Sequence, residues 1–190
     1  MRKIKWKVTV VALVAMAMTF LTQGTLAYYQ TVGKATNVVT SGDIQLRIHE
    51  TTDQGTAFPS EGVYVVPGDV VSKQVNIEND CEHPFYLRVK IVYGINSVEL
   101  PSEECFKLNL NEQDWELHDG WYYYKTVLNP AEFTSEVFSH VEIVGSKVDT
   151  SYIGKTLALT VRAQAVQSEN NPLTDGKTYT ASGWPQEVTA

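Results

Sequence analysis

The chain has 190 residues, of which 43% are hydrophobic, with ten tyrosines, four tryptophans and a formal net charge of −7. This length suits one domain with a substantial core, and the composition excludes a disordered chain. Because the charge is acidic and no basic stripe is visible, nucleic acids and anionic membrane surfaces are excluded as expected partners.

The N-terminus has the features of a secretory signal peptide, in the usual order. Four basic residues open the chain: Arg2, Lys3, Lys5 and Lys7. The apolar run that follows, residues 8–21, is shorter than the ~20 residues of a transmembrane helix. We therefore expect a signal peptide over residues 1–27, cut by a signal peptidase between Ala27 and Tyr28, with no membrane span afterwards. The alternative is an uncleaved membrane anchor.

The expected cleavage changes the charge of the exported protein. Four of the fifteen basic residues and none of the twenty-two acidic residues lie in residues 1–27. The remainder therefore carries eleven basic and twenty-two acidic groups, a formal net charge of −11. The expected location is outside the cell, secreted into an extracellular matrix or held at the cell surface.

Apolar and polar residues alternate along most of the mature chain, which is typical of strands with one buried face. In residues 157–165, for example, Leu157, Leu159 and Val161 alternate with Ala158 and Thr160. Similar or shorter strand segments are expected at residues 44–48, 63–66, 74–78, 85–91, 106–110, 115–118, 121–128 and 138–144. No long segment has a period of 3.6. The pattern predicts an all-β fold, a two-layer antiparallel β-sandwich that is jelly-roll-like.

Turn residues and composition divide the mature chain. Pro67-Gly68-Asp69 predicts a turn, and Asp119-Gly120 predicts a tight hairpin, because glycine tolerates a positive φ. We expect an N-terminal extended segment over 28–36, the sandwich domain over 37–167, and a polar C-terminal tail over 168–190. This tail is expected to be mobile unless Trp184 docks it.

Two cysteines, Cys81 and Cys105, are candidates for one disulfide in an exported protein. The bridge would close a loop of roughly 25 residues and add about 3 kcal/mol in the chain-entropy model. The alternative is two separate buried thiols.

No catalytic or metal motif stands out. The four histidines, His49, His83, His118 and His140, have no zinc-site spacing, and Pro84 prevents a helix after His83. No Gly-x-Ser-x-Gly sequence is present. Asp69 is expected to cap a turn, or alternatively to bind calcium with Glu78 or Asp80. We therefore predict a non-enzyme with no catalytic residue, metal or cofactor.

The aromatic run Trp121-Tyr122-Tyr123-Tyr124 raises a carbohydrate-binding hypothesis. In a strand, Trp121 and Tyr123 would enter the core while Tyr122 and Tyr124 line the surface. Exposure of Trp115, Tyr122 and Tyr124 in one plane would favour a secreted module that binds polysaccharide or cell wall. The alternative is core packing and cross-strand pairing.

Three segments resemble a known family. They are GTLAYY with ATNVVTSGDIQLRI near the cleavage site, VVPGDVVSKQVNIEND at 65–80, and LALTVRAQAVQ at 157–167. Together they resemble the TasA and camelysin family of exported Gram-positive proteins, also described as spore-coat-associated protein N-like. Residues 97–148 carry little of the pattern, and the chain lacks the long insertions of some TasA-like members.

The resemblance implies a jelly-roll subunit of extracellular biofilm fibres, in which the N-terminal segment of each subunit adds a strand to its neighbour. The implied partner is another copy of the chain or a related matrix subunit. The segment would be Tyr28, Tyr29, Gln30, Thr31, Val32 and Gly33, which an open sheet edge can accept. Alternatively, Tyr28–Thr36 folds back as the first strand of its own domain. Because camelysin relatives have been classed as metallopeptidases, such an activity is a further alternative.

Overall fold

The computed structural model describes residues 29–33, 36–37, 44–95, 98–100, 105–148 and 156–185. The expected signal peptide and both sides of its cleavage site, Ala27 and Tyr28, lie outside these ranges. Within them, no helix has the length and apolar character needed to cross a membrane. The strands are β1 (Tyr29–Gly33), β2 (Thr36–Asn37), β3 (Leu46–Thr51), β4 (Val63–Val65), β5 (Val70–Asn79), β6 (Phe85–Ile95), β7 (Val98–Leu100), β8 (Phe106–Leu110), β9 (Trp115–His118), β10 (Trp121–Tyr124), β11 (Phe138–Ile143) and β12 (Thr156–Gln167).

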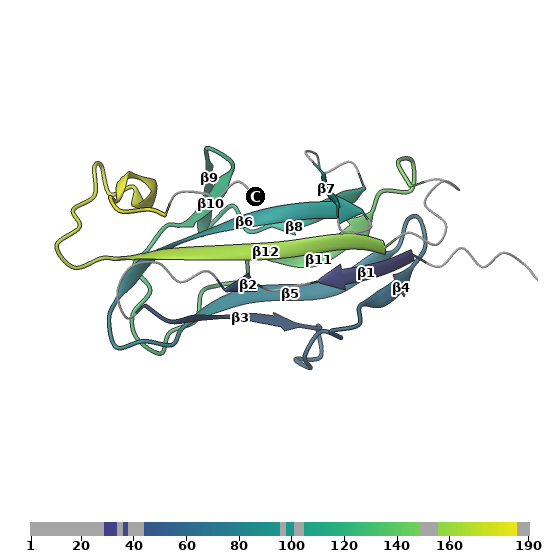
Figure 1. Ribbon diagram of the computed structural model, residues 1–190, viewed down its shortest axis with the longest axis horizontal. Coiled ribbons are helices and arrows are strands. Elements are labelled where there is room, and N and C mark those ends of the chain that lie inside the picture. Colours follow the sequence, from purple (N-terminus) through teal and green to yellow (C-terminus); the bar gives the residue numbers. More distant parts are fainter. Residues whose placement is uncertain are drawn as a thin grey trace, which may run out of the picture.

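The strands form two sheets packed as a sandwich (Figure 1). The eight-stranded sheet has the order β4-β1-β12-β6-β10-β9, with β2 beside β12 and β7 beside β6. The four-stranded sheet has the order β3-β5-β11-β8. The predicted all-β sandwich is thus confirmed, whereas the jelly-roll connectivity stays a prediction.

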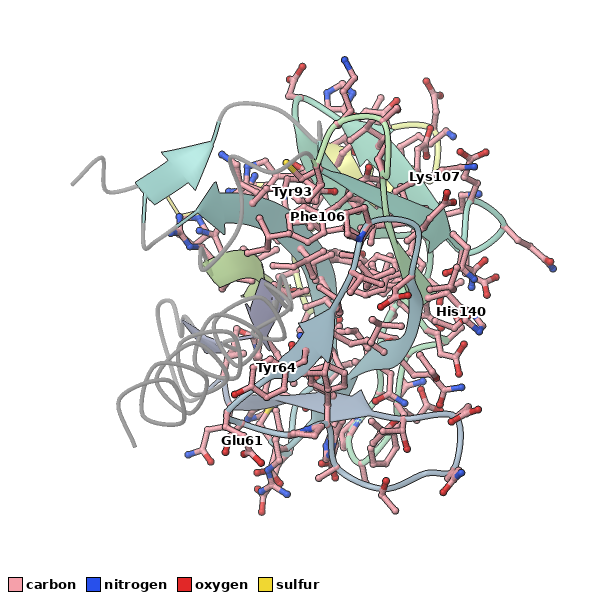
Figure 2. The ribbon with its side chains drawn as sticks, turned by 90° about the vertical axis from the view of Figure 1, so that its right-hand side faces the viewer. Glu61, Tyr64, Tyr93, Phe106, Lys107 and His140 are labelled. Atoms are coloured by element: carbon pink, nitrogen blue, oxygen red, sulfur yellow. The ribbon has the colours of Figure 1, made fainter. Side chains whose placement is uncertain are left out.

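The core lies between the sheets and is built by the alternation seen in the sequence. In β12, Leu157, Leu159 and Val161 are fully buried, and β5 contributes Val75 and Ile77 from the opposite sheet. Figure 2, which looks along the sandwich from one end, shows Tyr93 and Phe106 meeting between the layers, with ring centres 5.4 Å apart. The buried faces of β5 and β12 therefore point to one shared core.

Both predicted turns are present. Asp119 and Gly120 have φ values of 47° and 77° and join β9 to β10, a two-residue hairpin of the kind that matches strand twist. In the turn before β5, Gly68 has φ 93°, and the Asp69 amide donates to the Val66 carbonyl at 3.0 Å. Proline at the second position and glycine at the third suit this turn.

Three features differ from the expected strands. β10 ends at Tyr124, because the chain then turns and the Lys125 amide donates to the Asp114 carbonyl. The short strands β2 and β7 were not expected, since two or three residues carry no readable period. Finally, β1 and β2 both run parallel to β12, whereas the other strand pairs are antiparallel.

Candidate assembly site

Strand β1 fills a slot between β12 and β4. Gln30 to Gly33 pair in parallel with Thr156 to Leu159 of β12, and Tyr29 to Thr31 pair in antiparallel with β4. Figure 1 shows β1 lying beside β12 near one end of the sandwich. The sequence leaves two possibilities for this segment: a strand donated to a neighbour, or the first strand of its own domain. The structure has the second, because residues 29–33 form a strand of their own domain.

The slot depends on its occupant. Among the described residues, β4 pairs with β1 and with no other strand, so the position of β4 in the sheet depends on β1. The flanking residues Leu157, Leu159 and Val65 are almost fully buried and belong to the main core. Removal of β1 would open the core at this place and leave both flanking strands with unpaired backbone groups.

A second N-terminal strand extends the same edge. Thr36 and Asn37 of β2 pair in parallel with Arg162 and Ala163. One edge of β12 is therefore lined from residue 156 towards residue 163 by N-terminal residues, while its other edge pairs with β6 over its whole length from Leu157 to Gln167. An extended peptide from the N-terminus is thus the natural partner of this edge.

The segment after β12 packs against the outer face of the larger sheet, in contrast to the expected mobile tail. Trp184 lies 5.3 Å from Tyr123, ring centre to ring centre, and 4.7 Å from the Arg88 guanidinium carbon. Tyr179 stacks on His118 with ring centres 4.0 Å apart. Up to residue 185, the tail is therefore docked on the sheet by Trp184, which is the alternative expected for it.

Arg88 is the centre of this packing, although it is only 8% exposed. Its guanidinium group donates to Gln164 Oε1 at 2.6 and 2.9 Å, to Tyr123 Oη at 2.9 Å and to the Pro185 carbonyl at 2.9 Å. The Trp121 ring centre lies 4.2 Å from the guanidinium carbon. A planar cation with five donors can satisfy such a ring of acceptors and stack on aromatic faces.

The expected orientation of the aromatic run is wrong. Trp121 and Tyr123 are buried, but under the C-terminal segment on the outer face, whereas half-buried Tyr122 and Tyr124 pack against the main core. Trp115 is 3% exposed. The three aromatics proposed to face a glycan therefore form no exposed plane. The C-terminal segment covers the outer face of β10, so aromatic content alone could not show which face turns inward.

The proposed disulfide is wrong, because both cysteines are free thiols. Cys81 follows Asn79 at the end of β5, whereas Cys105 precedes Phe106, which pairs with Ile143 beside the other end of β5. The ten residues of β5 span about 33 Å. A disulfide needs Cα atoms within about 7 Å. Cys81 instead contacts Asn79 Oδ1 through its Sγ at 3.0 Å.

The alternative calcium site is also wrong. Asp69 precedes β5, while Glu78 and Asp80 lie at its far end, so the three carboxylates do not meet. Asp69 accepts the Val66 amide at 2.7 Å, which is the predicted turn cap. The other two carboxylates form ion pairs with Arg47.

The histidines are scattered over the molecule. His49 lies 2.8 Å from Glu78 Oε2 through its Nε2, and the other three are exposed. Within the part of the chain that the structure describes, no group of three or more His, Cys, Asp or Glu side chains could hold a metal ion.

A buried ion pair inside the sandwich escaped the sequence interpretation. Lys73 is 1% exposed, shares the buried face of β5 with Val75, and places Nζ 3.0 Å from Glu50 Oε1. The same Nζ lies 4.7 Å from the Phe58 ring centre. Desolvation lowers the pKa of Lys73, although Glu50 opposes that change. The alternating pattern around residue 73 was the available signal, because it assigns Lys73 to the same face as Val75 and Ile77.

Comparisons of the chain with protein-family models, with curated proteins and with solved structures find no match.

Proposed function

We propose that this chain is a secreted structural protein of an extracellular matrix, which assembles with copies of itself by exchange of its N-terminal strand. The observation that supports the proposal most strongly is the slot between β4 and β12, which β1 fills in parallel to β12 and antiparallel to β4. The family resemblance to TasA and camelysin, the jelly-roll-like connectivity and a non-catalytic role belong to the same proposal.

Exchange changes the contact energy little, because donor and acceptor contacts are the same in the two states. A β1 strand from a second chain would pair with β12 and β4 in the same register, Thr31 opposite both Leu157 and Val63. Since each lost contact is regained in the partner, exchange costs little once the segment has left its slot. Assembly would therefore be slow to start and would depend on protein concentration.

The geometry of the connection decides between a fibre and a closed dimer. Residues 34–35, which lie outside the described ranges, connect β1 to β2 and must link two molecules after exchange of β1. Two chains that exchange reciprocally form a closed dimer, whereas exchange in one direction leaves a free slot and a free strand at the two ends. We propose exchange in one direction, because a matrix fibre requires ends that stay open.

The proposal is tested by sedimentation of two purified forms of the protein. One form begins at Tyr28 and the other begins at Asn37. We expect the longer form to enter large species with time and the shorter form not to polymerise. A third form keeps the fold intact and blocks exchange: cysteines at Gln30 and Tyr64, which are register partners, would lock β1 into its own chain when oxidised. We expect the oxidised form to stay monomeric and the reduced form to assemble.

A monomeric or strictly dimeric longer form would contradict the fibre. Equal assembly of the oxidised and reduced locked forms would contradict strand exchange even if polymers appear, because β1 cannot leave its slot while the lock is closed.

A further inference from the structure

A hollow of about 310 Å³ lies where the chain passes from one sheet to the other, between the end of β8 and the β9–β10 hairpin. It is separate from the β1 slot, because β9 is the last strand at the opposite end of the eight-stranded sheet. Pockets that hold small ligands begin at about this volume and combine an apolar floor with a few polar groups.

The floor of the hollow is apolar and reaches the solvent. Leu117 and Tyr122 are register partners in β9 and β10, and Leu110 ends β8. Leu117 is 59% exposed, one of the few large hydrophobic side chains so exposed among the described residues. The half-buried Tyr122 ring gives this floor an aromatic component, and flat aromatic surfaces pack well against the apolar faces of ligands.

The rim is polar and formally neutral. Glu112 and Glu116 are balanced there by Lys125 and Lys177, in a chain whose overall charge is acidic. The Lys177 ammonium lies 2.9 Å from Glu116, which raises the pKa of Lys177. Lys125 Nζ donates to the carbonyls of Glu112 and Gln113 at 2.8 and 2.7 Å. Because both cations already have protein partners, the rim favours neither a strong anion nor a strong cation.

One of the lining residues, Trp115, carries a donor with no partner among the described residues. This donor is the buried indole Nε1. Buried polar groups are nearly always paired, so an acceptor from a bound molecule would complete this one. A hydroxyl group can accept from the indole while it donates to a rim carboxylate or to the Asn111 amide oxygen.

From the aromatic floor, the neutral rim and the unpaired indole donor, we propose that this hollow binds an uncharged saccharide. This inference does not depend on strand exchange. The ligand would present the apolar face of a sugar ring to Tyr122 and Leu117 and its hydroxyl groups to the rim. A peptide that adds a strand to β9 fits less well: the strand has only four residues and carries Glu116 and His118, and charge disfavours edge pairing.

Nuclear magnetic resonance of the mature chain tests the proposal, with the Trp115 indole N–H signal as the reporter. The probes are the tetrasaccharides of β-1,4-linked glucose and of β-1,4-linked N-acetylglucosamine, with tetragalacturonate as the anionic comparison. We expect at least one neutral probe to shift the Trp115 signal in a saturable way and the anion to leave it unchanged.

Variants locate the site. Leu117→Arg places a charged side chain on the floor of the hollow and is expected to weaken binding at least tenfold. Because Leu117 is exposed, the variant should still fold. Val70→Arg, at a 60% exposed position on β5, is the matched control and should bind as the unchanged chain does. Failure of both neutral probes to bind would overturn the proposal, as would equal binding of the anion or equal weakening by both variants.

Discussion

The Arg88 guanidinium carbon lies 4.7 Å from the centre of the Trp184 ring, which connects the middle of β6 to a residue near the C-terminus. Trp121 faces the same guanidinium group, with its ring centre 4.2 Å away. The cation is held by hydrogen bonds to Gln164, to Tyr123 and to the Pro185 carbonyl. Segment 168–185 is therefore held to the sheet by a buried cation and by aromatic contacts.

The first prediction concerns this contact. Arg88→Lys should lower the free energy of unfolding by about 2 kcal/mol, because an ammonium cannot reach the same acceptors or stack in the same way. Hydrogen exchange should also quicken at residues 178–185. Arg47→Lys, at a 55% exposed side chain, is the control and should change stability by less than about 0.5 kcal/mol. Equal effects of the two variants would contradict a central role for Arg88.

The second prediction concerns the pair of Lys73 and Glu50. Lys73→Met alone should cost about 3 kcal/mol, since it leaves a mostly buried carboxylate without its cation. The double variant with Glu50→Leu should recover most of that loss. Chemical denaturation of the three proteins measures both effects, and a double variant less stable than Lys73→Met would contradict this description.

The pH dependence of the same pair has a definite sign. The folded-state pKa of Lys73 lies below its ordinary value of 10.5, so between these two values the unfolded chain binds more protons than the folded chain. The stability of the unchanged protein should therefore rise with pH in that window, relative to the double variant. A relative loss of stability as the pH rises towards 10 would show that the charged form is favoured by folding.

The third prediction follows from the position of the cysteines. The folded protein should contain two titratable thiols, with Cys81 reacting first because it is half-buried and Cys105 reacting slowly because it is 1% exposed. Ellman's reagent applied with and without denaturant measures both rates. No reactive thiol after denaturation without a reductant would point to a disulfide and contradict the separation of the two residues along β5.

The fourth prediction concerns the β9–β10 hairpin. Gly120 has φ 77° and its missing Cβ would meet open space, so Gly120→Ala tests backbone strain without a steric clash. We expect a loss of about 1 kcal/mol and a lower melting temperature. Asp119→Asn should be nearly neutral, because asparagine also tolerates the left-handed region. An unchanged melting temperature for Gly120→Ala would contradict the turn conformation.

Much of the sandwich could be predicted from local sequence. Alternation located β12 and the other long strands because one of their faces meets the core and the other is polar. The two turns could also be predicted locally, from Asp119-Gly120 and Pro67-Gly68, since each glycine has a positive φ. These features depend on neighbours within a few residues, which a sequence displays directly.

The predictions that were wrong or missing concern features that depend on contacts between residues far apart in the sequence. The faces of β10 could not be assigned because the C-terminal segment covers the outer one, so Trp121 is buried away from the main core. The cysteine pairing failed because chain separation does not show that Cys81 and Cys105 lie at opposite ends of β5. The sequence could not decide whether the β1 segment pairs within its own domain, since its pairing with β12 joins segments far apart in the chain.

Strand exchange is tested most directly by a disulfide between two different chains. One protein carries Gln30→Cys and the other Tyr64→Cys, both with Cys81→Ser, while the buried Cys105 is retained. These two positions are register partners of β1 and β4, and paired Cα atoms of antiparallel strands lie within disulfide range. When the proteins are mixed under mild oxidation, we predict a covalent heterodimer that is absent when Thr31→Cys replaces Gln30→Cys. No heterodimer, or one that forms equally with cysteine at residue 31, would contradict exchange of the N-terminal strand.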